Sequence, residues 1–475
     1  SRSQIPLSSP TFCSLSPVAL PVTFGSMGVV IETFIWEPSS SFFIFFFVST
    51  FLSILLFPYF AKNRTFGTFD HSVSSSFARF QRWFLAIYTL SSVMEGLWSV
   101  YGELELTSYG LSKESMVFYL SVGYSTALVL GPILGLVSDL MGQKRICLLY
   151  CVLHFVVGVW KRITMSPSAW FANICLSLAG LVYSFGFETW LVVEHEKQSQ
   201  RNDSLNETFW LMTFLESASL LGGQVLSNWL VDENVQHGIA FSATTSMFLS
   251  VVAIVCIVQT AKEPLKTLPF RDYSAAFYAY VLGDKRIWFL GTAQACLQFS
   301  TAVFWILWAP TIVADGREVN LGLIYPCFLG SRMLGSTVFP WLMSGQSMLR
   351  LEDCLVYIYA ILGIVFSIVA YDYQEIRILV VLFCLFHGCA GLALPLLARF
   401  RTMYVPNELR GGMISLSQVP ANAAILFCLI QRGYSNKIEN STMMAFGAIS
   451  LFTAAGCIYL LRRWGKSPHQ DWHKL

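Results

Sequence analysis

Long apolar stretches dominate the chain and are separated by short polar ones. The first covers residues 42–60 and contains the run FFIFFFVSTFLSILLF, and the rest form two groups divided by the longest polar interval, residues 262–286. A helix that crosses the ~30 Å hydrocarbon core of a bilayer needs about 20 mostly apolar residues. The pattern therefore predicts transmembrane helices at residues 42–60, then 83–100, 116–137, 146–160, 169–187, 210–230 and 239–259, and finally 287–313, 321–343, 355–370, 376–398, 412–430 and 443–461.

These intervals predict an all-α membrane protein of the major facilitator type, with two six-helix bundles and one extra N-terminal transmembrane helix. Residues 1–26 are rich in Ser and Pro, and we expect a disordered leader there or sequence outside the working protein. The expected units are residues 27–79 (extra helix and linker), 80–261 (first half), 262–286 (cytosolic central loop), 287–462 (second half) and 463–475 (cytosolic tail).

The composition supports a membrane protein. Hydrophobic residues make up 55% of the chain and charged residues 12%, and the mean hydropathy is +0.59. A soluble domain carries about 25% charged residues, so lipid must cover this chain's surface. The net charge of +2 comes without a basic stripe, which argues against a nucleic-acid partner. We expect a monomer without a cofactor or metal, in the plasma membrane, with an internal membrane as the alternative.

The distribution of Lys and Arg predicts the orientation. If the loop carrying Lys144 and Arg145 is cytosolic, strict alternation places most of the 30 basic residues on the same side. Both ends of the twelve-helix unit then face the cytosol. The extra helix puts the N-terminus on the other side.

Ionisable residues inside predicted spans are few, and such residues are costly unless they serve a function or have a partner. Arg332 lies in the middle of its span, far from either end. Its planar guanidinium suits an oxyanion, and the alternative is a structural ion pair with a buried Glu. The other ionisable residues in spans are Glu95, Glu188, Glu216, His154 and His387.

Two of these carboxylates are candidates for proton coupling. Glu95 and Glu188 lie in spans, and a buried carboxylate whose pKa is raised can take up and release protons. The alternative is that they form local hydrogen bonds or neutralise Arg332. His387 precedes Gly388 in a Gly-rich span, so we expect it at a cavity, whereas His154 reads as a helix-packing residue.

The segment GLVSDLMGQKR follows the second span of the first half. Gly135 permits close helix approach, and Gly142 permits a sharp turn. Asp139 can cap another helix or pair across the bundle, while Lys144 and Arg145 hold the cytosolic side. At this position the pattern GxxxDxxGxKR indicates the major facilitator superfamily and a role in conformational change.

A closer resemblance appears in several short stretches. Residues 187–195, FETWLVVEH, resemble the FESWLVAEH segment of the molybdate-anion transporter family. Further stretches that are similar to the same family occur at residues 77–81, 291–295, 307–310, 333–336, 404–408 and 419–422. The extra N-terminal helix is another shared feature. The resemblance covers the chain from about Met27 onward and implies molybdate as the substrate.

The chain departs from that family's pattern at positions that carry charge. Gln298 stands where the family has an acidic residue, Gln418 stands for an Arg, and His387 for a Glu. Asn173 replaces another Arg, and Glu95 with the following Gly replaces Asp-Trp. An acid and a base are thus exchanged for amides, and Arg332 reads as a relocated positive charge. The substrate site is expected to contain Arg332, Gln298, Gln418, Asn422 and His387.

Three functions are compatible with these features. The first is secondary active transport of a small oxyanion, molybdate by resemblance, through alternating access of a site between the halves. The second is transport of another solute, an organic anion or a neutral molecule. The third is a non-transporting membrane sensor. Against a sensor, the sequence shows no sizeable soluble domain that could relay a signal. A membrane enzyme is disfavoured because HExxH, GxSxG and P-loop patterns are missing from the sequence.

The orientation can be tested directly. We predict that a cysteine introduced at Gln143 is protected from an impermeant thiol reagent in intact cells, because the basic loop faces the cytosol. Modification in intact cells would invert the whole topology.

Overall fold

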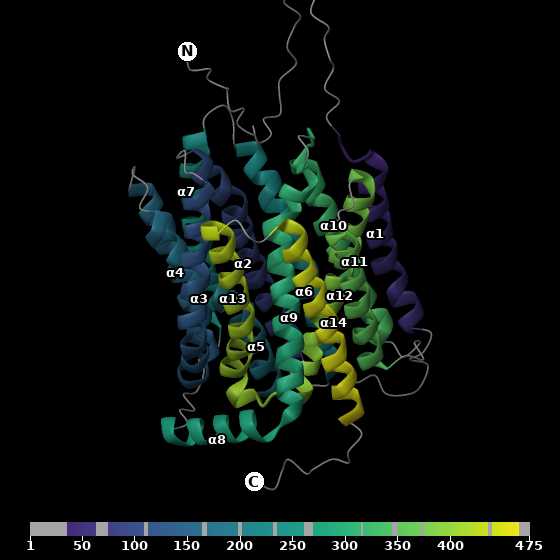
Figure 1. The fold of residues 1–475 in the computed structure, drawn as a ribbon. Coiled ribbons are helices and arrows are strands. Elements are labelled where there is room, and N and C mark those ends of the chain that lie inside the picture. The colour runs from purple at the N-terminus through teal and green to yellow at the C-terminus, as the bar shows by residue number, and fades with distance from the viewer. Residues whose placement is uncertain are drawn as a thin grey trace, which may run out of the picture.

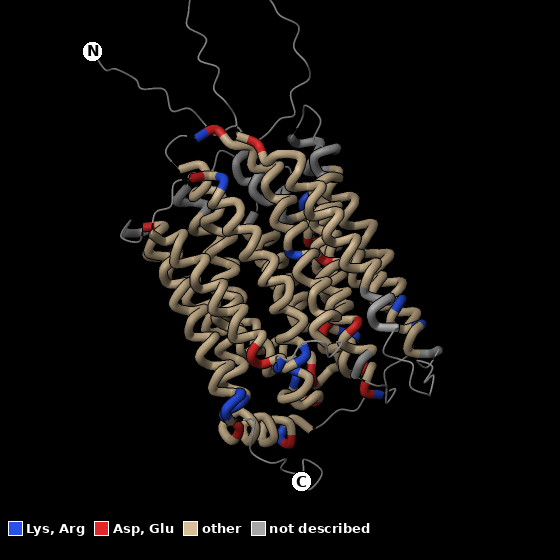
Figure 2. The backbone as a smooth tube through the Cα atoms, turned by 90° about the vertical axis from the view of Figure 1, so that its right-hand side faces the viewer, with Lys and Arg blue, Asp and Glu red and all other residues tan. Residues whose placement is uncertain are grey.

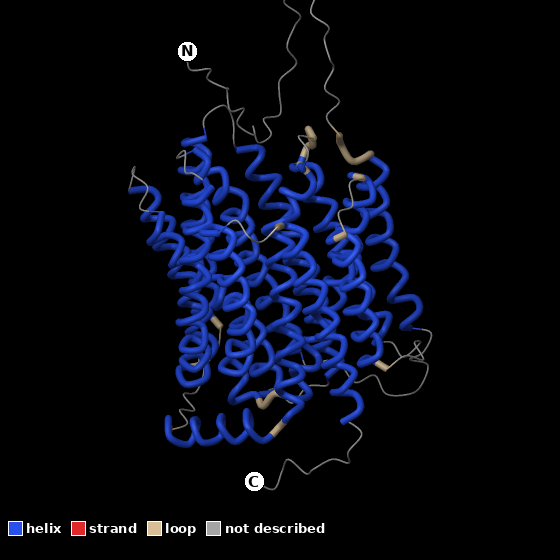
Figure 3. The backbone as a smooth tube through the Cα atoms, in the orientation of Figure 1, coloured by secondary structure: helices blue, strands red, loops and turns tan. Residues whose placement is uncertain are grey.

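The computed structural model describes residues 36–62, 75–108, 113–163, 169–197, 202–230, 235–260, 269–314, 317–343, 350–371, 375–435 and 439–464. The predicted leader and the last eleven residues of the tail lie outside this part of the chain. Within it, nearly every residue is helical (Figure 3). The extended pairing seen there is a single parallel bridge between Trp36 and Val319.

The first helices in chain order are α1 (Ser40–Lys62), α2 (Ser75–Ser108), α3 (Lys113–Met141), α4 (Gln143–Ile163), α5 (Ala169–Lys197), α6 (Asn202–Leu230) and α7 (Val235–Gln259). They are followed by α8 (Phe270–Gly283), α9 (Lys285–Ile312), α10 (Leu321–Met343), α11 (Leu351–Ala370), α12 (Ile376–Tyr404), the short 3-10 helix η2 (Asn407–Leu409), α13 (Arg410–Ser435) and α14 (Asn440–Trp464).

Each predicted span coincides with one long helix. Nine helices in the described ranges are long and apolar enough to cross a membrane. The long helices α2, α6 and α10, which carry Glu95, Glu216 and Arg332, fall outside those nine. The predicted all-α membrane protein is confirmed by this architecture.

Two boundaries differ from the prediction in ways that matter for the site. The interval expected as a central loop contains helix α8. Helix α12 continues past residue 398 to Tyr404, which adds more than one turn and brings Arg399 and Arg401 into the helix. Hydropathy alone stops at the first charged residue, whereas a helix continues as long as its backbone bonds and its side-chain partners allow.

The helices form two packed groups. We call α2 to α7 the first set and α9 to α14 the second set. Each set has its own large apolar core, with Phe84, Tyr150 and Trp190 in the first and Phe304, Tyr359 and Phe366 in the second. Many large apolar side chains point outward instead, among them Phe47, Val129, Phe248, Tyr278 and Ile449. Such a surface needs lipid, since apolar atoms exposed to water over this extent are unfavourable.

The two sets meet along two seams. Helix α3 packs on α13 at one seam, and α6 packs on α10 and α12 at the other. The extra helix α1 lies against α10, where Phe46 contacts Gly330 and the Trp341 indole donates to Ser53. Helix α1 is therefore attached to the second set.

The two ends of the bundle are distinct. In Figure 1, α8 lies across the lower end of the bundle, where α14 also ends, and we call this the α8 end. Charged residues gather at both ends, with few in the middle (Figure 2). That distribution is expected when the middle of the bundle is surrounded by hydrocarbon.

Glycines bring α10 and α12 into backbone contact next to Arg332. A Cβ at Gly335 would overlap the carbonyl oxygen of Gly388, and a Cβ at Gly391 would overlap that of Arg332. Close approach of this kind is a common use of small residues between membrane helices. It fixes the backbone from which the Arg332 side chain extends.

We predict that Gly335→Ala lowers the melting temperature of the purified protein. Overpacking typically costs about 1–3 kcal/mol, more than the ~1 kcal/mol that Ala gains over Gly in a helix. The matched control is Gly222→Ala, because a Cβ there meets nothing within 4 Å. Equal melting temperatures for the two variants would contradict the packing argument.

Candidate functional site

One ion pair joins the two sets in the middle of the bundle. Arg332 on α10 donates through Nη2 to the Glu216 Oε1 on α6, and the distance is 2.9 Å. The two side chains are only 13% and 20% exposed. A charge buried at this depth is tolerated when a partner of opposite sign lies beside it. The structure thus places the predicted Arg332 against one of the acidic residues that the sequence identified.

Aromatic hydroxyls surround the Glu216 carboxylate. The Tyr88 hydroxyl on α2 donates to Glu216 Oε2 at 3.2 Å. The Tyr88 ring stacks on Tyr183 of α5 at 5.3 Å, and the Tyr183 hydroxyl lies 2.6 Å from Ser92 Oγ. Both carboxylate oxygens of Glu216 therefore have a donor, one from each set of helices.

The predicted amides form two pairs built on α13. Gln298 of α9 donates to Asn422 at 3.3 Å, and Gln418 donates to Ser184 of α5 at 2.8 Å. Gln418 and Asn422 are buried. The second pair again crosses between the sets. Within the described ranges, no hydrogen bond joins these amides to Arg332.

His387 of α12 lies among aromatic rings contributed by α9, α10 and α12 itself. Its ring is perpendicular to Phe304 at 4.5 Å and stacks on Phe328 at 5.4 Å, with Trp305 and Phe386 also in contact. The side chain is 2% exposed, and its Nε2 has no hydrogen-bond partner among the described residues. A buried polar atom without a partner is unusual and calls for an explanation.

Glu95 belongs to a polar cluster inside the first set. Its Oε1 lies 3.4 Å from His154 Nε2. The Trp98 indole N–H, which can only donate, points to His154 Nδ1 at 3.1 Å. His154 therefore accepts at Nδ1 and donates from Nε2 to Glu95, which assigns the neutral tautomer to the imidazole.

At the α8 end, Asp139 caps a helix of the other set. Its two carboxylate oxygens accept from the backbone N–H groups of Gly411 (2.9 Å) and Gly412 (2.7 Å), in the first turn of α13. A carboxylate at a helix N-terminus satisfies unpaired donors and complements the helix dipole. Gly135 makes this approach possible, because a Cβ there would overlap Ser415.

Helix α8 adds a third partner to Asp139. The Tyr273 hydroxyl donates to Asp139 Oδ2 at 3.0 Å. Burial, and secondly the neighbouring Asp139 carboxylate, raise the pKa of Tyr273 above its ordinary value, so the phenol remains a donor. The predicted central loop thus contributes directly to the contact between the sets.

The remaining residues of the GxxxDxxGxKR pattern have local roles. Gly142 adopts φ 98°, which favours glycine. Lys144 Nζ donates to the carbonyl of Thr260 at the end of α7, and Arg145 is exposed. Gln143 is buried beside Asp139, so Arg145 is the better position for the labelling experiment above.

A second ionic network at the α8 end was not foreseen from the sequence. Glu188 of α5 accepts a bidentate pair from Arg401, one arm of which is 2.8 Å, and Arg410 Nη1 lies 3.7 Å from the same carboxylate. Both arginines are buried. The sequence reading took Arg332 as the one basic residue inside a span. Arg401 lies beyond the predicted end of its span, in the last turn of α12, because α12 extends past its apolar part.

Further contacts between the sets surround this network. Arg399 donates to Asn206, and Asn407 donates to Glu196 at 2.6 Å. With Glu188 engaged by two guanidinium groups, its carboxylate is a structural link of the α8 end. The sequence does contain a feature that could have indicated this network. Three arginines, Arg399, Arg401 and Arg410, come soon after the end of a predicted span.

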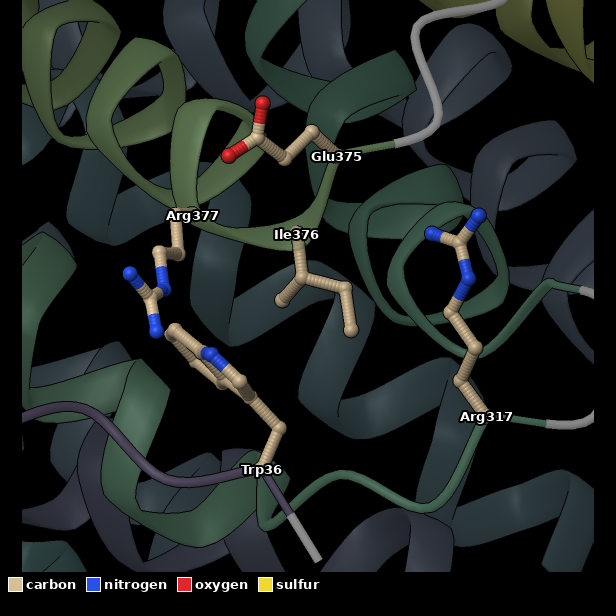
Figure 4. A pocket seen from close by; sticks show the side chains of 5 residues that line it. All are labelled: Trp36, Arg317, Glu375, Ile376 and Arg377. Atoms are coloured by element: carbon tan, nitrogen blue, oxygen red, sulfur yellow. The ribbon is translucent and has the colours of Figure 1, made fainter. Parts of the chain in front are cut away.

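A pocket of about 460 Å³ opens near the start of α12. It lies outside the middle layer, by which we mean the part of the bundle around the Arg332–Glu216 pair. It is lined by Trp36, Arg317, Glu375, Ile376 and Arg377, and Figure 4 shows the two arginines on opposite sides of Ile376. Trp36 is fixed by backbone hydrogen bonds with Glu318 and Asn320. This pocket could not be predicted from the sequence, because the residues that line it are far apart in the chain.

Comparison with known proteins places these features in a family context. Residues 44–417 match a major facilitator family model described as sugar transporters with 12 transmembrane segments. The chain is 22% identical over 429 residues to the molybdate-anion transporter of Takifugu rubripes, covering 82% of this chain and 86% of that protein. It is 23% identical over 359 residues to the molybdate-anion transporter of Xenopus tropicalis, covering 71% and 76%.

Solved structures show the same fold. The fucose:proton symporter of E. coli superimposes with a TM-score of 0.64 at 11% identity, over 82% of this chain and 98% of that one. A human organic anion transporter gives a TM-score of 0.59 at 13% identity, over 80% and 99%. The resemblance read from the sequence is confirmed by the sequence relatives.

We predict that Asp139→Ala accelerates hydrogen exchange at the Gly411 and Gly412 amides. Loss of a helix cap costs about 1 kcal/mol, and a local opening that is ~1 kcal/mol cheaper exchanges about fivefold faster. Exchange is measured by mass spectrometry on the purified protein. The control is Asp272→Ala, which removes an exposed acid from α8 at the same end. Unchanged exchange in the Asp139 variant would refute the capping role.

Proposed function

Because the chain belongs to the twelve-span transporter family of the major facilitator superfamily, as a divergent relative of the molybdate-anion transporters, we propose that it moves a small oxyanion, molybdate, across a membrane by alternating access. A multi-pass transporter, rather than an enzyme, is what the family and the helices establish. The substrate, the binding residues and the path are the parts that we propose.

The observation that carries the proposal is the Arg332–Glu216 pair. Arg332 supplies a fixed positive charge in mid-bundle, at the seam where the two sets meet. Its planar donors match two oxygens of an oxyanion as well as they match a carboxylate. An anion that arrives at this seam can therefore replace Glu216 as the partner of Arg332.

The amide side chains of α9 and α13 fit an acceptor-only ligand. An oxyanion carries no donors, so its remaining oxygens require N–H or O–H groups. Gln298, Gln418 and Asn422 offer amide donors, and all three lie on helices of the second set. The Gln418–Ser184 bond also crosses to the first set, so rearrangement of the sets would change which donors are available.

Alternating access requires that contacts at the α8 end break and re-form. The Asp139 cap on α13 and the Glu188–Arg401–Arg410 network both join the two sets there. Together they hold this end closed in the present arrangement. Release of substrate toward the α8 end requires that these contacts open, while the middle layer is exposed to that side.

The contacts of the buried acids indicate which of them could bind a coupling proton. Glu188 belongs to the network of the α8 end, so we assign it a gating role in place of the proton-carrying role expected from the sequence. Glu95 keeps a partner in neutral His154 and remains a candidate for proton binding.

A neutral solute is the second candidate. The family model is described as sugar transporters, and the amides of Gln298, Gln418 and Asn422 can bind hydroxyl groups as well as oxyanions. Uptake of a neutral sugar that is indifferent to Arg332 would favour this alternative.

We predict that proteoliposomes with the purified protein take up molybdate, and that sulfate and nitrate compete to different extents. Arg332→Lys should lower uptake about tenfold because the planar fork is lost, and Arg332→Gln should nearly abolish it. The control is Arg377→Gln, which removes an exposed guanidinium away from the middle layer.

Stability separates a binding role from a structural one. Removing one member of a buried ion pair costs about 3–5 kcal/mol, so Arg332→Gln is also combined with Glu216→Gln. If Arg332 binds the anion, the double variant recovers its melting temperature but not its uptake. Recovery of uptake in the double variant would mean that the pair is structural only.

A further inference from the structure

The Glu216 carboxylate has a place that differs from those of the other buried acids. Glu188 is held by two arginines, and Glu95 faces a neutral histidine inside the first set. Glu216 alone among these three shares its single cationic partner with the proposed substrate site. Any anion that binds Arg332 must therefore take that partner away from Glu216.

The displaced carboxylate cannot remain charged without a cost. A carboxylate that loses its partner inside the bundle is left as a buried uncompensated charge, and such a group neutralises instead. The pair is neutral before the exchange, with one positive and one negative charge. It is neutral again if Arg332 pairs with a singly charged anion while Glu216 takes up a proton.

We propose that Glu216 is the coupling residue, which binds a proton whenever the substrate oxyanion occupies Arg332. The Glu216–Arg332 ion pair is replaced by an Arg332–anion pair, and an O–H bond forms on the carboxylate with a proton from the solvent on the anion's side. The inference rests on the proposed function for the identity of the anion. It makes the protein a proton–oxyanion symporter.

The side chains around Glu216 are compatible with that exchange. Tyr88 from α2 donates to the carboxylate, and Tyr183 from α5 stacks on Tyr88 and continues to Ser92. A tyrosine hydroxyl can donate to the carboxylate and accept from the carboxylic acid, so either protonation state has a partner. Helix α7 packs on α2 and α6, and it carries no charged side chain over residues 241–259. It therefore adds no further charge beside Glu216.

A divalent oxyanion needs a second proton, and His387 on α12 is placed to take it. His387 stacks on Phe328, which lies one turn before Arg332 on α10, while Gly391, one turn after His387, faces the Arg332 backbone. The histidine thus lies about one helical turn from Arg332 along the seam. Its buried Nε2 has no hydrogen-bond partner in the described part of the chain. Burial and the Arg332 charge disfavour a charged imidazole, so the ring takes up a proton only when the anion has neutralised Arg332.

The experiment compares two modes of molybdate transport in proteoliposomes. One is accumulation driven by an imposed proton gradient, and the other is exchange of molybdate without a gradient. Glutamine resembles the protonated acid, so Glu216→Gln should keep exchange within about threefold of the wild type but lose gradient-driven accumulation. Its exchange should also become independent of pH. Glu95→Gln tests the rival coupling acid of the first set, and the control is Asp272→Asn, which removes an exposed acid of α8 and should keep gradient-driven accumulation.

Three results would overturn the inference while leaving the proposed function standing. They are wild-type exchange without any response to a proton gradient, accumulation retained in Glu216→Gln, and accumulation lost in Glu95→Gln instead. Absence of any molybdate transport by the wild type would overturn the proposed function itself.

A second measurement covers the case in which Glu216→Gln does not fold. Molybdate is added to the purified wild-type protein in weak buffer, and the pH is followed. Proton uptake that saturates with the anion supports the inference, and binding without proton uptake contradicts it. His387→Asn should reduce this uptake without abolishing it.

Discussion

The requirement that a charge buried among membrane helices has a partner organises the middle of this protein. Arg332 and Glu216 meet that requirement jointly, one from each set of helices, at 2.9 Å. Their position depends on the backbone contacts that Gly335 and Gly391 allow between α10 and α12. The aromatic groups of Tyr88 and Tyr183 then complete the surroundings of the carboxylate. A pair that spans two movable bodies in this way can exchange partners when the bodies move.

The charged residues at the α8 end differ from the Arg332–Glu216 pair in their partners. At the α8 end, Asp139 caps α13 and Glu188 is engaged by Arg401 and Arg410, so each carboxylate has more than one donor. Glu188 is held by two guanidinium groups, whereas Glu216 has one cationic partner, Arg332, beside the neutral Tyr88 hydroxyl. The number of cationic partners thus separates the α8 end from the proposed binding layer, although both are built from acids and arginines.

Much of this architecture follows from the sequence, because about 20 apolar residues are needed to cross a bilayer and the chain repeats that length. Arg332 and Glu216 stood out for the same reason, as charges where hydrocarbon is expected, whereas Asp139 stood out as part of the GxxxDxxGxKR pattern that follows a span. The partners could not be predicted. Which acid faces Arg332 depends on how α6 packs against α10, and periodicity does not report that packing. Arg401 was missed because α12 continues beyond its apolar residues, and α8 was missed because its 14 residues are too few for a transmembrane span.

The account's central claim is that an oxyanion replaces Glu216 at Arg332. Molybdenum scatters X-rays anomalously, so crystals grown with molybdate locate the anion without ambiguity of identity. The account predicts an anomalous peak within hydrogen-bond distance of the Arg332 guanidinium, with the Glu216 carboxylate moved away from it. A peak elsewhere in the bundle, with the Arg332–Glu216 pair intact, would contradict the claim.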